Sequence, residues 1–436
     1  MLIAGVERKL IECGSDGKGA YLSEDEFKML RLLTEQKLLT NEQMHTFISR
    51  KIKILPDSLR RKLYDWAKYD IVVPSEYLLG KKGRSYNVYR IGKRGLNALI
   101  DNEYLEEDKR KMRISKFDKL SNQTHFLSTQ HLIIKTLAEL DFNENIKSIS
   151  SANLPYLDST VGNKLVIPDW ILRKGDLHLN IELDVGGEKK DILTEKLKGY
   201  ITYCKQNPDQ KHVVIFAVID NSFPTKEKFG ERNGRIANIK SKFMNLNELH
   251  LNNLDVYVLP LYRAHKVASQ ILAGTLPLKA SNKDHEITTA KRLLEVNSYF
   301  DYNIEEIDLD DIYPYDVESY MYADKMLRIS NTSNTYSETI LLVMMEEGLV
   351  QNLDRLNYLN ILSKEGRLKI KVDKIVGIYR TEEEIEHEPL KVISSRILMA
   401  SVNEWEEQME KEPKFYRLVG NITKEEVTYE GSSYNG

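Results

Sequence analysis

Apolar residues in the first hundred positions recur first with the period of helices and then with that of strands. Three helical stretches each begin with a capping signal, at Ser23, Thr40 and Pro56. Two short β-type runs follow, at 71–78 and 86–91, and a further apolar helical stretch comes after them. The pattern predicts three helices, a β-hairpin and a closing helix.

The middle of the chain predicts a mixed sheet between helices. A helical stretch and a short strand come first, followed by a hairpin of two strands, a helix, a buried strand, a helix and a last strand. These elements are expected at 123–140, 146–151, 165–172, 177–184, around Lys196 and Tyr200, at 212–219, at 232–249 and at 256–259.

The last third alternates between acidic and apolar stretches. An acidic, tyrosine-rich segment precedes a run in which strands and helices are again predicted. The acids of that segment are expected either to be disordered or to bind a basic partner. We predict an N-terminal domain, a charged linker, an α/β core, an acidic connecting region and a small C-terminal α/β domain with its tail: 1–105, 106–119, 120–270, 271–335 and 336–436.

Charge is distributed unevenly over the 436 residues. Residues 1–119 carry 25 Lys and Arg against 18 Asp and Glu, whereas residues 281–436 carry 18 against 31. A basic N-terminal part favours an anionic partner such as DNA. The alternative is ordinary variation of surface charge.

The basic residues gather on the elements that would contact DNA in a winged helix, whose order of elements is the one predicted here. They lie on one face of the third helix, in the Gly-punctuated tip of the hairpin, and at the start of the closing helix. The candidates are Arg60, Arg61, Lys62, Lys68, Lys81, Lys82, Arg84, Lys93 and Arg94. The ending from Tyr89 to Gly95 resembles the close of many bacterial winged-helix DNA-binding proteins. A winged helix that contacts only protein is the alternative.

Three carboxylates stand on the predicted central hairpin. Asp169 follows Pro168 on one strand, and Glu182 and Asp184 share one face of the next because side chains alternate along a strand. Converging carboxylates are the ligands that Mg²⁺ accepts from proteins, so a Mg²⁺ site is expected, with Mn²⁺ as a substitute. The alternatives are that Asp169 caps a helix or pairs with Lys196, and that the two acids on the second strand face solvent.

This stretch resembles the core of PD-(D/E)xK nucleases, except that Asp184 stands where the motif lysine is expected. More closely, it resembles the replication-relaxation family of bacterial plasmids and mobile elements. The matching residues are Pro168, Asp169, Glu182, Asp184, Gly186, Lys196 and Tyr200. The resemblance implies an N-terminal winged helix followed by a nuclease-like α/β core.

The resemblance also implies roles for individual residues. Asp169, Glu182 and Lys196 would be catalytic, with Lys196 replacing the missing lysine, and Asp169, Glu182 and Asp184 would hold the metal. Tyr200 lies one helical turn after Lys196. Gln123 and His125, in the preceding helix, are further candidates for the site.

These features predict a DNA-binding protein of a plasmid, phage or integrative element, acting in replication or mobilisation. Its partners would be DNA and other replication or mobilisation proteins. The alternatives are an active Mg²⁺-dependent DNA nuclease targeted by the winged helix and a transcription regulator. No apolar run approaches the ~20 residues that span a bilayer. With only Cys13 and Cys204 in the chain, we expect a reducing, cytoplasmic setting.

Overall fold

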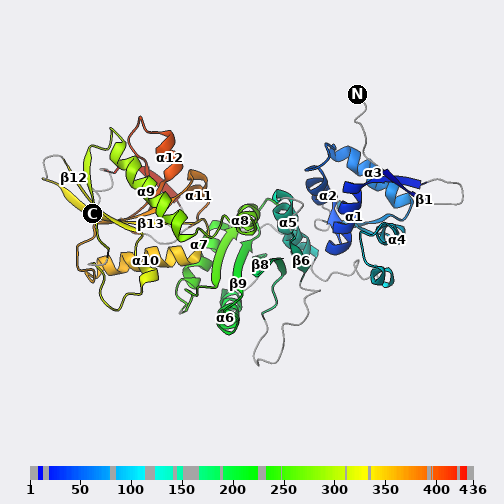
Figure 1. Ribbon diagram of the computed structural model, residues 1–436, viewed down its shortest axis with the longest axis horizontal. Helices are drawn as coiled ribbons and strands as arrows, with labels where there is room; N and C mark the ends of the chain where they lie inside the picture. Colours follow the sequence, from blue (N-terminus) through cyan, green and yellow to red (C-terminus); the bar gives the residue numbers. More distant parts are fainter. Residues whose placement is uncertain are drawn as a thin grey trace. The chain divides into compact units, whose positions relative to one another are not determined.

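The chain divides into two compact units, the first made of residues 1–154 and 219–229 and the second of 155–218 and 230–436. Both combine helices and strands (Figure 1), so the predicted mixed α/β class is confirmed. The computed structural model describes residues 8–12, 19–78, 85–112, 123–140, 145–150, 166–186, 190–223, 232–246, 248–309, 312–331, 335–389, 394, 396–419 and 423–429.

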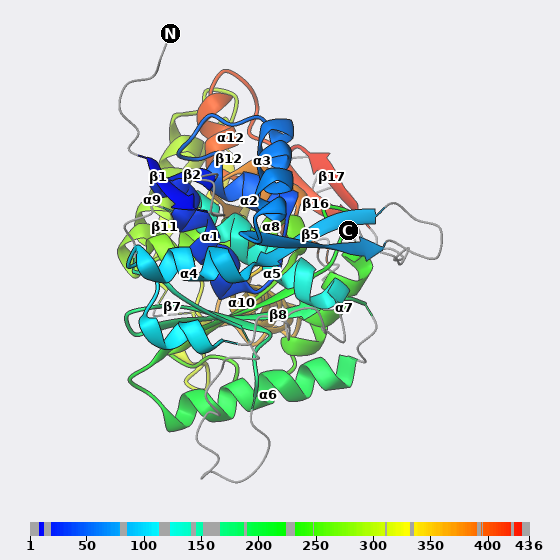
Figure 2. The same cartoon turned by 90° about the vertical axis from the view of Figure 1, so that its right-hand side faces the viewer.

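The first unit contains the element order predicted from the periodicity. Its elements are β1 (Arg8–Glu12), β2 (Gly19–Ser23), α1 (Glu24–Gln36), β3 (Leu39–Thr40), α2 (Asn41–Ile48), α3 (Pro56–Lys68), β4 (Val72–Leu78), β5 (Ser85–Ile91), α4 (Lys93–Asp101), the 3₁₀ turn η1 (Glu107–Lys111), α5 (Gln123–Glu139) and β6 (Lys147–Ser150). Strands β3, β5 and β4 form an antiparallel sheet in that order, and α3 lies beside it (Figure 2).

Local sequence explains why these helices begin where they do. Ser23 and Thr40 accept hydrogen bonds from the backbone of the third helical residue, and Glu26 and Gln43 return bonds to the cap backbone. Pro56 occupies the first turn of α3, where its missing N–H leaves no intrahelical bond unmade. The apolar faces of these helices bury residues such as Leu30, Leu33, Met44, Leu59 and Leu63.

Helix α5 is held against the N-terminal helices. The Gln43 side chain donates to the backbone oxygen of Leu127, and the Gln130 side chain donates to that of Gln36, at 3.2 and 2.8 Å. The sequence had placed this helix at the start of the nuclease-like domain. In the structure it belongs to the first compact unit.

The second unit holds two sheets. The elements of its first part are β7 (Trp170–Lys174), β8 (Leu177–Asp184), α6 (Lys190–Gln206), β9 (Lys211–Val218), α7 (Arg232–Phe243), β10 (Leu254–Pro260) and α8 (Leu261–Ala273). Strands β10, β9 and β8 are parallel, and β7 pairs antiparallel with β8. Strand β9 is buried along its whole length after Lys211, as its continuous apolar run predicts.

The C-terminal part forms a seven-stranded sheet whose central strands β13, β14 and β15 are parallel. Helices α9 and α10 lie on opposite sides of it (Figure 1). Its elements are α9 (Ala280–Val296), β11 (Tyr302–Ile307), η4 (Ser319–Met321), β12 (Lys325–Asn331), β13 (Ser337–Met344), α10 (Val350–Lys364), β14 (Lys374–Tyr379), α11 (Glu382–Glu386), β15 (Ile397–Ser401), α12 (Val402–Glu407), β16 (Phe415–Val419) and β17 (Thr423–Val427).

Within the second unit, the two sheets are joined by buried polar contacts. The N–H of Val258 donates to the backbone oxygen of Gly348 at 2.9 Å, and the buried Lys240 on α7 pairs with the buried Glu388. Segment 271–335, expected to be a connecting region, supplies α9 and two strands of the larger sheet. The compact units therefore divide the chain differently from the predicted domains, whose independent folding stays a prediction.

Candidate functional site: a buried carboxylate cluster

Asp169 and Glu182 lie side by side where β7 begins against β8. The N–H of Asp169 donates to the backbone oxygen of Ile181 at 3.0 Å, and its carboxylate accepts the N–H of Leu183 at 2.7 Å. Asp169 is therefore hydrogen-bonded to both chain neighbours of Glu182, to Ile181 through its backbone N–H and to Leu183 through its carboxylate. The predicted convergence of these two residues is present.

Glu182 is almost completely buried and is held by two side chains from α6. Lys196 Nζ lies 2.9 Å from one carboxylate oxygen, and the Tyr200 hydroxyl donates to the other at 2.7 Å. Residues four apart face the same side of a helix, so one turn of α6 delivers both groups. Burial raises the pKa of Glu182 to about 7, with the negative charge of Asp169 adding to this and Lys196 opposing it.

Asp184 on the same strand is fully buried and is paired with Arg235 from α7. Arg235 engages both carboxylate oxygens, one of them through its NH2 group at 2.7 Å. The N–H of Gly186 also donates to Asp184, at 3.0 Å. Arg235 is a site residue that the sequence analysis missed. Its only sequence signal is a basic position on a predicted helix.

These partners bear on whether the carboxylates fit a Mg²⁺ ion. A metal needs free carboxylate oxygens, but both oxygens of Glu182 and both of Asp184 are already engaged by donors from the chain. Among the residues that the structure describes, no three His, Cys, Asp or Glu side chains are grouped so that they could hold a metal ion. The arrangement as it stands does not fit the three-carboxylate site expected from the sequence.

The candidate DNA-contacting residues of the first unit fall into two groups. Arg60, Arg61, Lys68, Lys93 and Arg94 are exposed. In contrast, Lys62 forms an ion pair with the buried Glu26 of α1, so its positive charge is neutralised within the first unit. The hairpin-tip residues Lys81, Lys82 and Arg84 lie outside the described residues.

Gln123 and His125 belong to the first turn of α5, in the first unit. The backbone oxygen of His125 accepts the hydroxyl of Thr129 at 2.8 Å, as is common for threonine within a helix. The side chain of Gln123 lies outside the described residues.

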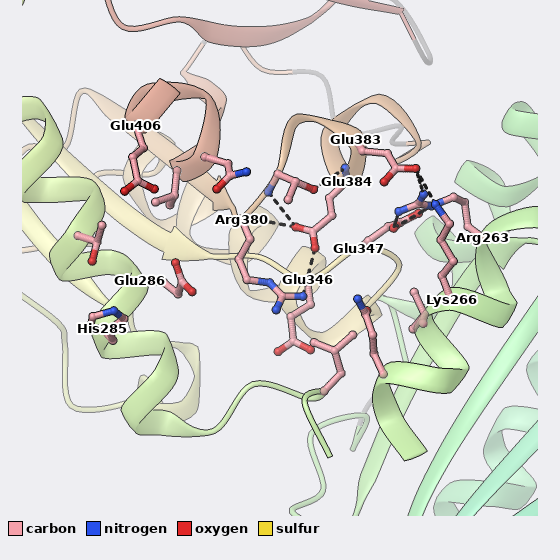
Figure 3. Close-up of a pocket in the computed structure, with 17 residues that line it drawn as sticks. Arg263, Lys266, His285, Glu286, Glu346, Glu347, Arg380, Glu383, Glu384 and Glu406 are labelled. Atoms are coloured by element: carbon pink, nitrogen blue, oxygen red, sulfur yellow. Dashed lines mark hydrogen bonds and ion pairs between the residues drawn. The ribbon is translucent and has the colours of Figure 1, made fainter. Parts of the chain in front are cut away.

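A second charged cluster, which the sequence analysis missed, lines a cavity of about 640 Å³ at the carboxyl ends of β13, β14 and β15. Side chains from α8 and α9 face one another across it, with Arg380 between them (Figure 3). Arg263 binds both oxygens of the buried Glu347, at 2.7 and 2.9 Å, and Arg380 lies 3.2 Å from Glu384. Burial raises the pKa of Glu347 to about 7, against the effect of Arg263.

Lys266, also on α8, pairs with Glu383 at 2.9 Å. Each of the three arginine and lysine side chains lining this cavity is thus matched by a glutamate. The sequence signal was the pair Glu346-Glu347 immediately after an apolar run, which marks acids at the end of a buried strand.

The architecture is that of a mixed α/β protein with a basic N-terminal unit. A buried carboxylate–cation cluster lies in the sheet formed by β7, β8, β9 and β10 of the second unit. The family model for replication-relaxation proteins matches residues 30–219, which include this cluster up to Tyr200 and most of the N-terminal elements. This segment matches the replication-relaxation family model, so the resemblance inferred from the sequence is confirmed. No curated protein and no solved structure matches the chain.

The family match supports a role in the replication or mobilisation of a plasmid or mobile element. The match ends at β9, so it does not extend to the seven-stranded sheet. None of the helices that the structure describes has the length and apolar character needed to cross a membrane.

Proposed function

We propose that this protein binds duplex DNA through its first unit during replication or mobilisation of a plasmid, phage or integrative element. The observation that carries the proposal is the exposure of Arg60 and Arg61 on α3, together with Lys93 and Arg94 at the start of α4. The elements α1, α2, α3, the hairpin β4–β5 and α4 follow the order of a winged helix, in which the third helix enters the major groove.

Binding would be dominated by phosphate contacts, which release counterions and make affinity fall steeply with salt. The hairpin tip would add three more cations, Lys81, Lys82 and Arg84. We further propose that the nuclease-like part does not cleave DNA. Lys196 and Arg235 place protein cations against Glu182 and Asp184, where a nuclease would place its metal.

The test is a fluorescence anisotropy titration of duplex DNA across a series of salt concentrations. The expected result is a linear fall of log affinity with log salt, and a shallower slope after Lys81, Lys82 and Arg84 are all replaced by Ala. Equal slopes of log affinity against log salt for the parent and the triple variant would show that the hairpin does not contact DNA. An absence of duplex binding even at low salt would refute the proposal.

The alternative is a Mg²⁺-dependent DNA nuclease with Asp169, Glu182 and Lys196 as its catalytic residues. Supercoiled and single-stranded DNA incubated with Mg²⁺ or Mn²⁺ would distinguish the two. Cleavage that disappears in the double variant Asp169→Ala, Glu182→Ala would replace the non-cleaving proposal by this one. A transcription regulator is the second alternative, and it would be favoured if Asp169 and Glu182 lay far apart. Against it, Asp169 is hydrogen-bonded to Ile181 and Leu183, the two neighbours of Glu182 in the chain.

A further inference from the structure

A groove of about 510 Å³ runs between the exposed face of α3 and the strands β4 and β5 in the first unit. Arg60, Arg61 and Tyr64 line it on the helix side, and Pro74, Asn87 and Tyr89 line it on the sheet side. A cavity of this volume is in the range of small-molecule sites. It is therefore large enough for a flat heteroaromatic ring.

The helix side of the groove presents an aromatic ring to solvent. Tyr64 is 66% exposed, although it stands in the middle of α3 between the buried residues Leu63 and Trp66. The Lys68 ammonium lies 4.4 Å from the centre of the ring. An exposed aromatic residue flanked by cations offers a surface on which an uncharged π-system can stack.

The sheet side of the groove is formed by strand residues that carry polar groups. Tyr89 is 4% exposed and fixed in the sheet, and burial raises the pKa of its hydroxyl, with the nearby Asn87 side chain opposing this effect. The exposed amide of Asn87 carries both donors and an acceptor. Such a group can bond the edge of a planar ring that enters the groove.

Two guanidinium groups and the Asp65 carboxylate also line the groove, and Asp65 is paired with Lys68 at 2.9 Å. Arg60 makes one exposed ion pair with Asp57, at 2.9 Å, which contributes little to stability and exchanges readily. Arg61 makes no ion pair with any residue that the structure describes. Both charges are thus available to phosphates next to a ring held in the groove.

An aromatic surface, hydrogen-bonding groups and adjacent cations are together the parts with which proteins bind single-stranded nucleic acid. A base inside a duplex has both faces covered by its neighbours, so only an unpaired base can stack on Tyr64.

We propose that this groove binds an unpaired nucleobase of DNA, stacked on Tyr64, with the flanking phosphates on Arg60 and Arg61. The inference rests on the proposed DNA binding of the first unit and adds a preference for DNA that is locally melted. A protein acting at a replication or transfer start site meets such DNA whenever the duplex opens.

The experiment compares the affinity of the full chain for a duplex with its affinity for the same duplex carrying a short unpaired bubble. The parent is expected to bind the bubble more tightly. Tyr64→Ala should reduce that preference by at least about fivefold, the lower limit of one lost stacking contact. Tyr64→Phe keeps the ring and should keep the preference.

Tyr21→Ala is the matched control, because Tyr21 is 60% exposed in the same unit but lies on β2, outside the groove. A fluorescent purine analogue placed in the bubble gives a direct signal. Its emission should be quenched by stacking with the parent and with Tyr64→Phe, and much less with Tyr64→Ala.

The outcomes separate this inference from the proposed function. Duplex binding without any preference for the bubble would overturn the groove assignment and leave the proposed function standing. A preference that Tyr64→Ala and Tyr21→Ala leave equally intact would also overturn it. If the parent bound neither the duplex nor the bubble, both the groove assignment and the proposed function would be refuted.

Discussion

Arg61 on α3 and Arg263 on α8 are both arginines on amphipathic helices, yet their surroundings are opposite. Arg61 is exposed in the first unit and makes no ion pair with any described residue. Arg263 is 5% exposed in the second unit and binds Glu347 through two nitrogens. A cation that is already paired inside the protein contributes to its fold, whereas one left at the surface is available to a partner.

The same distinction separates Lys62 from its neighbours on α3, and it applies to the carboxylates as well. In the central sheet, Glu182 and Asp184 are each neutralised by cations of the chain. The charges that the sequence suggested for metal chemistry are therefore part of the second unit's interior. Of the charges suggested for DNA, Arg60, Arg61, Lys68, Lys93 and Arg94 are on the surface of the first.

The largest effect is expected from Arg263→Ala. The substitution leaves Glu347 buried without its cation, which costs about 3 kcal/mol or more of unfolding free energy. Lys266→Ala is the control from the same helix, because its pair with Glu383 is exposed and should be worth less than about 1 kcal/mol. Urea denaturation measures both. Equal losses would contradict the distinction between the interior and surface pairs.

A slightly smaller effect is expected in the pH dependence of stability. A carboxyl with its pKa near 4.5 in the unfolded chain and about 7 in the folded one binds more protons when folded, so the unfolding free energy falls as pH rises between these values. The size is on the order of 3 kcal/mol for Glu182. Glu182→Gln cannot ionise, and its amide oxygen can still accept from Lys196 while its NH2 group donates to the Tyr200 oxygen. It should therefore show a weaker fall across this window.

Glu195→Gln provides the control for that measurement. Glu195 is on the same helix, but it is exposed and bonded to Lys198. Its replacement should leave the pH dependence of the parent unchanged. If Glu182→Gln follows the parent curve as well, then Glu182 does not titrate in this range and its burial has been misjudged.

The features that could be predicted from the sequence are those that depend on residues close together in the chain. Capping residues identified the starts of α1 and α2, and helical spacing placed Tyr200 one turn after Lys196, while the family resemblance assigned Lys196 to the same site as Glu182. These signals act over a few residues, or across one hairpin and the helix that follows it. They could therefore be recognised without any knowledge of the packing.

The rest depends on contacts between distant positions. Arg235 meets Asp184 across 51 residues, and Arg263 meets Glu347 across 84. No periodicity encodes such pairs, and each could be mistaken for an ordinary surface charge. For the same reason the sequence could not show that α5 packs against α2, or that the acidic segment 271–335 completes a sheet.

The smallest effect, and the sharpest test of the comparison, concerns two adjacent residues of α3. Arg61→Ala should reduce the magnitude of the salt slope for duplex binding by about 1, because one phosphate contact is lost. Lys62→Ala should leave the slope as it is, since the Lys62 amine is held by Glu26, and should instead lower the unfolding free energy by about 1 kcal/mol. Both quantities can be measured on the same preparations, by anisotropy across a salt series and by urea denaturation. A changed slope in Lys62→Ala, with stability intact, would show that its pair with Glu26 opens for DNA. The difference between paired and available charges would then not hold within this helix.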